Sequence, residues 1–577
     1  MLGPGLVTAI ALLGYFLGYR FYSAWLAKRV FQLDARAITP AHAQEDGIDF
    51  VPTRPLVLFG HHFASIAGLA PMLGPAVAVF WGWLPAFLWV VLGAVFIGCV
   101  HDFSAVVLSA RHRGESIGTL CEDILGSSAK GLFLALIFFG VSLAMGVFVY
   151  VISLLFSWGV DFNPEALNES VTSFPEVVMP SAGLMVVALV CGWLLYVKKK
   201  PLLPVTAVGF LALLSLIALG YLFPTLGFSR EAWPSQSTWI WVLMIYAYLA
   251  SVLPVWLLLQ ARDFLNSLLL VLGLILMYTG FFLQAPSFDA PAFNPNPVGA
   301  PPILPFVFIT IACGAASGFH SLVASGTTAR QLDNETHARP IGYGGMVAES
   351  LLGLIAVLAC TCVIPGRDSW ALHYGDWETA SGLGEKLGFF ISGSASFMGG
   401  LGVPIEMATT LVAMVVVSFA LTTLDSATRL LRFNLEEIGA AWAKSPILRV
   451  FGMPLQNRFL ATLIACASIC FFAFYKIDGI PAGLTLWTLF GGTNQLIAGL
   501  ALLTATVYLK RKGRNYWPLA IPAVFMVCMT MFALITKLFD FYHEAQTLLL
   551  VLASLLVIIG LGVSGTAVKA LAGDKRR

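Results

Sequence analysis

The chain has 577 residues, of which 59% are hydrophobic and 11% are charged, and its formal net charge is +2. Soluble domains carry about 25% charged residues, so this composition excludes an ordinary soluble protein. Long apolar runs recur from end to end, which predicts an all-α, polytopic membrane protein. The nine cysteines lie mostly inside these runs without zinc-finger spacing, so we expect small buried hydrophobic residues and not a disulfide framework. We expect no metal site and no cofactor. We also expect no nucleic-acid partner.

The apolar runs set the predicted spans, because a helix needs about 20 apolar residues to cross the hydrocarbon core. The first run lacks a preceding basic region and a clear cleavage site, so we interpret it as a transmembrane helix and not as a signal peptide. About fifteen spans are predicted, at residues 2–22, 60–80, 84–109, 130–157, 181–197, 202–222, 238–259, 264–284, 303–326, 343–364, 398–426, 457–475, 481–509, 517–537 and 545–567. A further segment, 388–400, is a candidate re-entrant piece.

Loop charges predict how the chain is oriented in the membrane. Every odd-numbered span is followed by basic residues, such as Arg262 after the seventh and 198–200 after the fifth. The loops 158–180 and 285–302 contain no Lys or Arg. Since cytoplasmic loops are rich in Lys and Arg, we expect the N-terminus outside and the C-terminus in the cytoplasm of a prokaryotic cell.

Two predicted spans carry helix breakers together with titratable side chains. The second begins with GHHFASIAGLAPMLGP, which includes His62, Ser65 and Gly68. The ninth lies seven spans later, so it runs antiparallel to the second. Its polar and small residues are Gly314, Ser317, Gly318, His320, Ser321, Ser325 and Gly326. Paired breaks of this kind indicate inverted repeats and a substrate site near the middle of the membrane, where half-helix ends attract anions and freed carbonyls hold cations. The alternative is close helix packing through small residues.

Two more polar groups interrupt later spans. Thr422, Thr423, Asp425 and Ser426 cluster near the cytoplasmic end of the eleventh span, where hydroxyls suit Na⁺ and a carboxylate suits a proton or a cation. Ordinary helix-end polarity is the alternative for this cluster. In the thirteenth span, Gly491 and Gly492 are expected to break the helix, and the side chains of Thr493, Asn494 and Gln495 either join helices or line a cavity.

Ionisable residues inside spans suggest function by default, because they are costly in a bilayer. His101, Asp102 and Glu349 are candidates for ion or proton coupling, and Glu406 lies near the outer end of its span. Structural ion pairs are the alternative, with Arg111 or Arg113 for Asp102 and with Arg339 for Glu349. His61 and His62 are expected at the inner membrane boundary.

Several blocks between Gly60 and Gly499 resemble the carbon-starvation protein A (CstA) family of bacterial and archaeal inner-membrane proteins. The blocks are GHHFASIAG, HDF, RHRGESIG, SGFHSLVASGTTARQL, TTLDSATRL and LFGGTNQLIAG. The last block departs from a family tendency toward LFGTANQLLA but keeps the Asn and Gln. The resemblance implies a secondary transporter used during carbon limitation, with peptide uptake or proton-driven pyruvate uptake among its relatives.

The resemblance also implies a leucine-transporter (LeuT) type core of five-plus-five inverted repeats with discontinuous helices, plus peripheral helices. The repeats would span 60–222 and 303–509, with 238–284 as an inserted helix pair. The first helix and its loop would occupy 1–59, and a C-terminal helix pair with a basic tail would occupy 517–577. A cation site between the second and eleventh spans is implied as well.

Four functions remain open at this point. The first is a symporter of pyruvate coupled to H⁺ or Na⁺, and the second is a peptide symporter in which Glu349 or Glu406 binds the amino end. The third is an intramembrane metalloenzyme using residues such as His61, His101 and His320, which we do not expect because no ligand spacing supports it. The fourth is a nutrient sensor, although no soluble signalling domain is predicted. The sequence does not indicate an oligomeric state.

Overall fold

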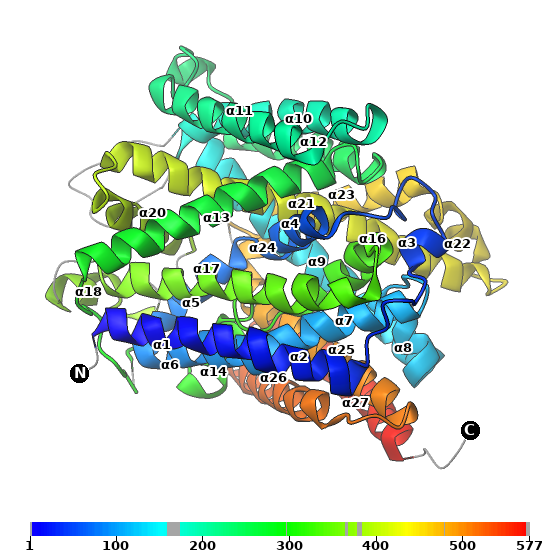
Figure 1. The fold of residues 1–577 in the computed structure, drawn as a ribbon. Coiled ribbons are helices and arrows are strands. Elements are labelled where there is room, and N and C mark those ends of the chain that lie inside the picture. The colour runs from blue at the N-terminus through cyan, green and yellow to red at the C-terminus, as the bar shows by residue number, and fades with distance from the viewer. Residues whose placement is uncertain are drawn as a thin grey trace.

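The computed structural model describes residues 3–158, 173–295, 297–363, 367–377, 383–477 and 479–572. The described chain is a bundle of helices, many of which run side by side across Figure 1. The two termini lie at opposite ends of this bundle. The only strands in the described segments are β1 (Lys476–Ile477) and β2 (Ile480–Pro481), which form a short antiparallel hairpin.

Helices follow one another along almost the whole described chain. In the first part they are α1 (Pro4–Leu17), α2 (Ser23–Trp25), α3 (Pro40–Ala43), α4 (Pro55–Ile66), α5 (Ala70–Ala78), α6 (Trp83–Leu88), α7 (Cys99–Arg111), α8 (Ile117–Leu125) and α9 (Ser127–Phe156). In the middle part they are α10 (Val178–Gly192), α11 (Leu202–Leu222), α12 (Gln236–Val252), α13 (Leu259–Gln284), α14 (Ile303–Thr310), α15 (Gly318–Val323), α16 (Ala329–Gln331) and α17 (Gly344–Thr361). In the last part they are α18 (Arg367–His373), α20 (Leu383–Gly399), α21 (Ile405–Ala443), α22 (Arg449–Leu455), α23 (Arg458–Phe474), α24 (Ala482–Thr485), α25 (Trp487–Arg511), α26 (Trp517–His543) and α27 (Thr547–Ala572). Short π-helical turns extend several of them, including η8 (Ala324–Thr328) and η10 (Arg339–Tyr343).

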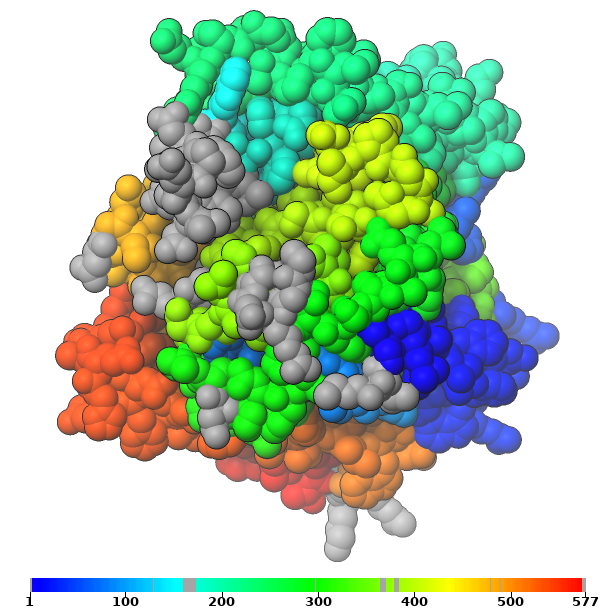
Figure 2. All heavy atoms as spheres, turned by 90° about the vertical axis from the view of Figure 1, so that its left-hand side faces the viewer, coloured from blue at the N-terminus to red at the C-terminus, as the bar shows by residue number. Residues whose placement is uncertain are grey.

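The helices form an enclosed centre and an apolar periphery. α21 and α25 are almost wholly covered by other helices, whereas α1, α11 and α27 expose most of their apolar surface. In Figure 1, α10, α11 and α12 form one edge of the bundle, and α26 and α27 form the opposite edge. Figure 2 views one end of the bundle, where green segments from the middle of the chain lie between the orange C-terminal helices and the blue N-terminal helix. An apolar outside around a polar centre is the arrangement that a bilayer requires.

The predicted spans coincide with helices, but their number is not settled by length and apolarity. Among the described residues, eleven helices are long and apolar enough to cross a membrane, and two bent helix pairs raise this number to thirteen. The other two predicted spans fall on α12, which has 17 residues, and on the broken segment formed by α14 and α15. The predicted count of fifteen therefore stays a prediction.

Three local expectations were wrong. The eleventh span was placed at 398–426, but α21 begins after Pro404 and continues to Ala443, so the polar cluster at 422–426 lies in the middle of this helix and not near its end. The predicted re-entrant piece at 388–400 belongs to a separate helix, α20. Finally, α25 is continuous across Gly491 and Gly492. These glycines serve close packing, since a Cβ at Gly491 would lie 2.7 Å from the carbonyl oxygen of Ile309.

A polar clamp explains why α21 stays helical beyond the predicted end of its span. The Asp49 carboxylate, in the loop before α4, accepts hydrogen bonds from Arg429 at 2.6 Å and from Arg432 at 3.3 Å. Burial alone would raise the pKa of Asp49, but the two guanidiniums outweigh it and hold that pKa below its ordinary value. The clamp therefore joins this loop to α21 as an ion pair.

We predict that Asp49→Asn lowers the melting temperature of the detergent-solubilised protein, because charge-assisted hydrogen bonds contribute about 1.5–3 kcal/mol. A carboxyl whose folded pKa is lowered stabilises the fold fully above its unfolded pKa, and this stabilisation is lost as the pH falls through the folded value. The difference from the wild type should be constant from about pH 5 to 8 and should shrink below about pH 4. Asp333→Asn, in an exposed pair with His42, is the matched control. Equal melting temperatures of wild type and Asp49→Asn at neutral pH would contradict the clamp.

Candidate functional site

The first helix break lies between α4 and α5, as predicted. Residues 67–69 separate the two helices, which are bent by 48° relative to each other. The hydroxyls of Thr422 and Thr423 on α21 donate to the carbonyls of Ala64 and Ser65, at 2.8 and 3.1 Å. Carbonyls at a helix end have no partner within the helix, so these two hydroxyls replace the missing amides.

The same contact brings together most of the predicted ion-site residues. Ser65 Oγ lies 2.9 Å from Ser426 Oγ, directly beside the two threonine bonds. Ser65, Thr422, Thr423 and Ser426 are thus one buried hydroxyl cluster between α4 and α21. Asp425 was predicted with them, but its carboxylate takes part in a different network, which is described below.

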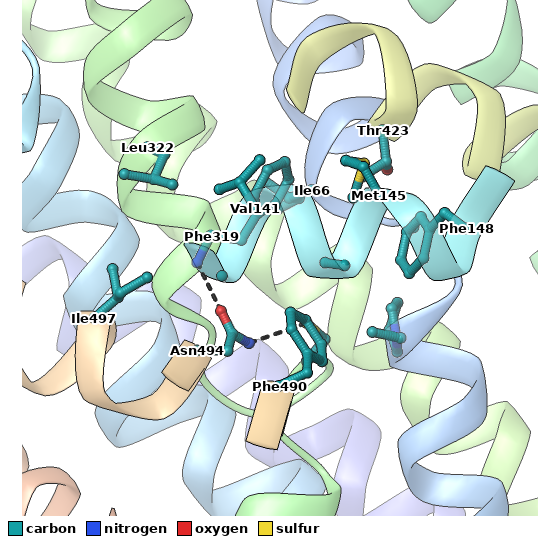
Figure 3. A pocket seen from close by; sticks show the side chains of 16 residues that line it. Ile66, Val141, Met145, Phe148, Phe319, Leu322, Thr423, Phe490, Asn494 and Ile497 are labelled. Atoms are coloured by element: carbon teal, nitrogen blue, oxygen red, sulfur yellow. Dashed lines mark hydrogen bonds between the residues drawn. The ribbon is translucent and has the colours of Figure 1, made fainter. Parts of the chain in front are cut away.

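The second break separates α14 from α15 and is held by α25. Residues 311–317 are not helical, and the backbone N–H of Phe319 donates to Asn494 Oδ1 at 2.9 Å. The Asn494 amide also bonds Ser317 Oγ at 3.0 Å. This single buried side chain therefore satisfies both ends of the turn from the unwound segment into α15. Figure 3 shows its bond to the Phe319 amide.

A small cavity lies where the two breaks face each other. Its volume is about 20 Å³, which is room for one or two water molecules. Figure 3 shows side chains from α9, α15, α21 and α25 converging on it. The lining residues are Ile66, Gly68, Ala70, Pro71, Gly140, Val141, Ala144, Met145, Phe148, Cys313, Phe319, Leu322, Thr423, Phe490, Asn494 and Ile497. The lining is largely apolar, and the cavity is narrow.

The predicted substrate-binding residues surround this cavity unevenly. Gly68 and Asn494 line it directly. Ser65, Ser317, Gly318, His320 and Ser321 are fully buried near the two breaks but are not part of the lining. The Gln495 amide points elsewhere and donates to the carbonyl of Phe308 at 3.0 Å.

A buried cluster of acids and imidazoles adjoins the second break. His101 Nδ1 lies 2.8 Å from one Asp102 oxygen, and His320 Nδ1 lies 2.9 Å from the other. His320 Nε2 lies 3.2 Å from Glu349 Oε2, and the other Glu349 oxygen accepts the backbone N–H of Gly314 at 3.3 Å. These four side chains have no exposed surface. The cluster connects α7, α15 and α17 to the unwound segment.

The structural ion pairs considered as alternatives do not form. Arg111 pairs with Glu335 at 2.5 Å, and Arg339 donates to Ser23 Oγ at 2.8 Å. Asp102 and Glu349 have histidine partners instead. Histidine can exist with or without its proton, whereas arginine stays protonated.

A second buried network, which the sequence did not reveal, lies on α13. Asp263 accepts from Arg262 at 2.8 Å and lies 2.6 Å from His61 Nδ1. Arg262 also donates to Asp425, whose carboxylate binds the Tyr246 hydroxyl as well. Arg262 was interpreted as a cytoplasmic loop charge, but it lies in the first turn of α13 with no exposed surface. The expectation failed because counting loop charges does not test whether a basic residue has a buried partner.

The two adjacent histidines are also buried inside the protein, which the sequence did not predict. They lie in the middle of α4, which begins at Pro55. His62 Nδ1 lies 2.9 Å from Thr328 Oγ1 on η8, and its ring packs against Gly345, where a Cβ would lie 2.8 Å from it. His62 therefore links α4 to the α15 side of the site without reaching the cavity.

Glu406, the remaining predicted acid, is exposed in the first turn of α21 and contributes to neither cluster.

One group among the described residues has a geometry suited to a metal ion. Cys313, His320 and Glu349 each place one donor atom within 4.8 Å of the others. Of these three, the sequence analysis named His320 as a possible metal ligand and did not name Cys313.

The apolar lining of the cavity was missed altogether. Met145, Phe148 and Phe490 line it, but each lies in an ordinary apolar run, so no sequence signal distinguishes it from a core residue. Asp263 carried a detectable signal, since an Arg-Asp pair opens an otherwise apolar helix.

Comparison with known protein families identifies related proteins. A family model described as carbon starvation protein CstA matches residues 5–391 and 377–533. A protein named peptide transporter CstA, from Campylobacter jejuni, is 33% identical over 92% of this chain and 80% of its own length. A protein named pyruvate/proton symporter BtsT, from Escherichia coli, is 31% identical over 91% of this chain and 80% of its own length.

Among solved structures the similarity is weaker. A manganese transporter of Eremococcus coleocola aligns over 91% of this chain and 98% of its own, with 13% identity and a TM-score of 0.41. Mhp1, a nucleobase-cation-symport-1 family transporter, aligns over 90% of this chain and 95% of its own, with 12% identity and a TM-score of 0.35.

We predict that Asn494→Ala loosens the unwound segment 311–317, because the Phe319 amide and Ser317 lose their buried partner. An unpaired buried donor costs about 1–3 kcal/mol, so the rate at which a membrane-permeant maleimide alkylates Cys313 should rise about tenfold. Mass spectrometry of the Cys313 peptide separates it from the other eight cysteines. The control is Thr493→Val, since the Thr493 hydroxyl bonds only the Leu489 carbonyl of its own helix. An unchanged rate in Asn494→Ala would show that Asn494 does not hold the break.

Proposed function

Because this chain belongs to the carbon starvation protein CstA family, we propose that it is a secondary transporter that imports a small nutrient together with protons. The observation that carries the proposal is the meeting of two broken helices at a narrow cavity, next to the buried cluster of Asp102, His320 and Glu349. Broken helices near mid-membrane are where such transporters hold their substrate. Buried titratable groups beside them are the usual carriers of protons.

Proton binding at this cluster would change the structure of the site. With both carboxylates ionised, His320 lies between two negative charges and holds a proton readily. When a proton moves to Glu349, its carboxylate loses charge and binds the Gly314 amide more weakly. That amide belongs to the unwound segment, so protonation and opening of the cavity are linked through a single hydrogen bond.

We propose a proton and not sodium as the coupling ion. A sodium site was expected from the hydroxyls of Thr422, Thr423 and Ser426. Two of these hydroxyls donate to the carbonyls that a sodium ion would need as ligands, and the third bonds Ser65. The relative from Escherichia coli is also named a proton symporter.

Pyruvate or a monocarboxylate of similar size is our first choice of substrate. At about 20 Å³ the cavity has to widen for any substrate, and a molecule as small as pyruvate requires the smaller change. Its few polar groups are mainly Thr423 and Asn494, and the N-terminal end of α5 at Ala70 faces it with a positive dipole, which suits a carboxylate. A peptide also needs a partner for its amino group, and neither Glu349 nor Glu406 lines the cavity. A peptide remains the second candidate, because several relatives are named peptide transporters.

The wider architecture follows from the same proposal. We propose that residues 60–222 and 303–509 are inverted repeats, supported by the breaks that each contains near its start. The remaining helices would be peripheral, and the chain would lie in the bacterial inner membrane with its N-terminus outside. Loop charge, as described above, supports this orientation.

The direct test of the substrate is uptake of labelled pyruvate into proteoliposomes under an inward proton gradient. We expect accumulation that collapses with a protonophore, ignores excess dipeptide, and is unchanged when Na⁺ is replaced by K⁺. Accumulation of labelled dipeptide with no pyruvate uptake would move the assignment to peptides. Accumulation of neither would overturn the proposal.

Substitutions in the buried cluster test the coupling. We predict that Asp102→Asn and Glu349→Gln each reduce gradient-driven uptake at least about tenfold, because each removes a proton-binding carboxylate from the cluster. Glu406→Gln, at an exposed carboxylate, should retain wild-type uptake. Gradient-driven uptake at the wild-type rate in both cluster variants would remove these residues from the coupling role.

A further inference from the structure

The network on α13 has two acidic side chains but only one base that is always charged. Its members are His61 on α4, Arg262 and Asp263 on α13, Asp425 on α21 and Tyr246 on α12. His61, Arg262, Asp263 and Asp425 have no exposed surface. Solvent therefore does not screen their charges, and the charge of the network has to be balanced from within.

The charge count depends on the protonation of His61. Arg262 is always protonated and contributes +1, while ionised Asp263 and Asp425 contribute −2. Tyr246 is neutral as a hydroxyl donor to Asp425. A neutral His61 leaves one uncompensated negative charge in the membrane interior, and a protonated His61 makes the sum zero. An uncompensated buried charge is strongly unfavourable, so the network needs one proton.

We propose that His61 is a second proton-binding group of the transporter, separate from the cluster of Asp102, His320 and Glu349. The inference rests on the proposed function and deepens it. Neighbouring residues on a helix point about 100° apart, so His61 and His62 face different partners. His61 meets Asp263 on α13, whereas His62 meets Thr328 on η8, toward the other cluster. α4 thus carries one proton-binding contact on the side away from the second break.

The network is attached to the part of α4 that ends at the first break. His61 precedes the end of this helix at Ile66 by about one and a half turns. Asp425 is next to Ser426, which bonds Ser65 at that same end. A proton on His61 strengthens the bond between α4 and Asp263. Its release leaves α4 held to α13 by a weaker, neutral contact, which frees this half-helix to move relative to α13.

Other titratable groups on the elements packed against α4 have partners of their own. Glu349 on α17 and His320 on α15 bind each other. On η10, Arg339 donates to Ser23 and to the Tyr19 carbonyl, and the Tyr343 hydroxyl donates to the Val95 carbonyl. Farther along α21, Arg429 and Arg432 bind Asp49. Within the described part of the chain, the groups that face His61 are therefore Asp263 and, through it, Arg262 and Asp425.

The proton balance is simple. In each cycle His61 takes one proton from the side of substrate entry and releases it on the other side, and no other reactant is needed. Together with one proton on the Asp102 cluster, this gives two protons for each substrate molecule.

The test uses variants that balance the network without a proton. In Asp263→Asn, Arg262 and Asp425 already neutralise each other, so His61 has no need of a proton. In the double variant His61→Gln/Asp263→Asn the titratable ring is gone and the charge is still balanced. The single variant His61→Gln keeps one unbalanced charge, so we expect a lower melting temperature than that of the double variant. His42→Gln/Asp333→Asn is the matched control, because it makes the same two changes in an exposed His–Asp pair, whose atoms lie 2.9 Å apart.

The quantity measured is the number of protons transported with each substrate molecule. It is obtained in proteoliposomes as the substrate gradient that just balances a known proton gradient. The probe is labelled pyruvate, or labelled dipeptide if pyruvate is not transported. We expect this ratio to fall by one in Asp263→Asn and in the double variant, and to be unchanged in the control. Both variants should still exchange internal for external substrate at equal pH. A wild-type ratio in both variants would overturn the inference, as would a double variant no more stable than His61→Gln. Failure of the proposed function looks different, because then the wild type itself shows no proton-driven accumulation.

Discussion

The structure depends on one constraint: every backbone group freed where a membrane helix is broken must find a partner inside the protein. At the first break, Thr422 and Thr423 supply donors to the carbonyls at the end of α4. At the second break, Asn494 accepts the Phe319 amide and Glu349 accepts the Gly314 amide. These partners come from α17, α21 and α25, so the positions of three further helices follow from the need to support two breaks.

Buried charged side chains also need partners inside the protein, and these partners include titratable groups. The acids at the centre are paired with imidazoles in one cluster and with an arginine and an imidazole in the other. Both clusters touch a broken helix, through Gly314 in the first case and through α4 in the second. A proton that enters either cluster thereby changes the contacts of a half-helix that borders the cavity. In the function we propose, substrate access and proton binding would be coupled by packing, without any long-range signal.

Much of this site could be predicted from the sequence, because its members are unusual where they stand. Glycine, proline and histidine inside an apolar run marked the first break, and Asn494 in α25 was recognised as an amide that needs a partner. The wrong expectations concern residues with two possible explanations. Gly491 and Gly492 suit a break or close packing, and packing is what the helix shows. Arg262 suits a loop or a buried pair, and only the three-dimensional contact with Asp425 decides. Apolar lining residues such as Phe490 give no sequence signal at all.

The most direct test of the central claim is whether substrate movement itself carries protons. Purified protein is reconstituted into vesicles that contain a trapped pH indicator, and pyruvate or a dipeptide is added outside at equal pH on both sides, with the membrane potential clamped. The proposed coupling predicts that the vesicle interior acidifies when the transported substrate is added, and that neither empty vesicles nor a poorly transported analogue cause this change. Entry of labelled substrate without acidification of the interior would contradict it.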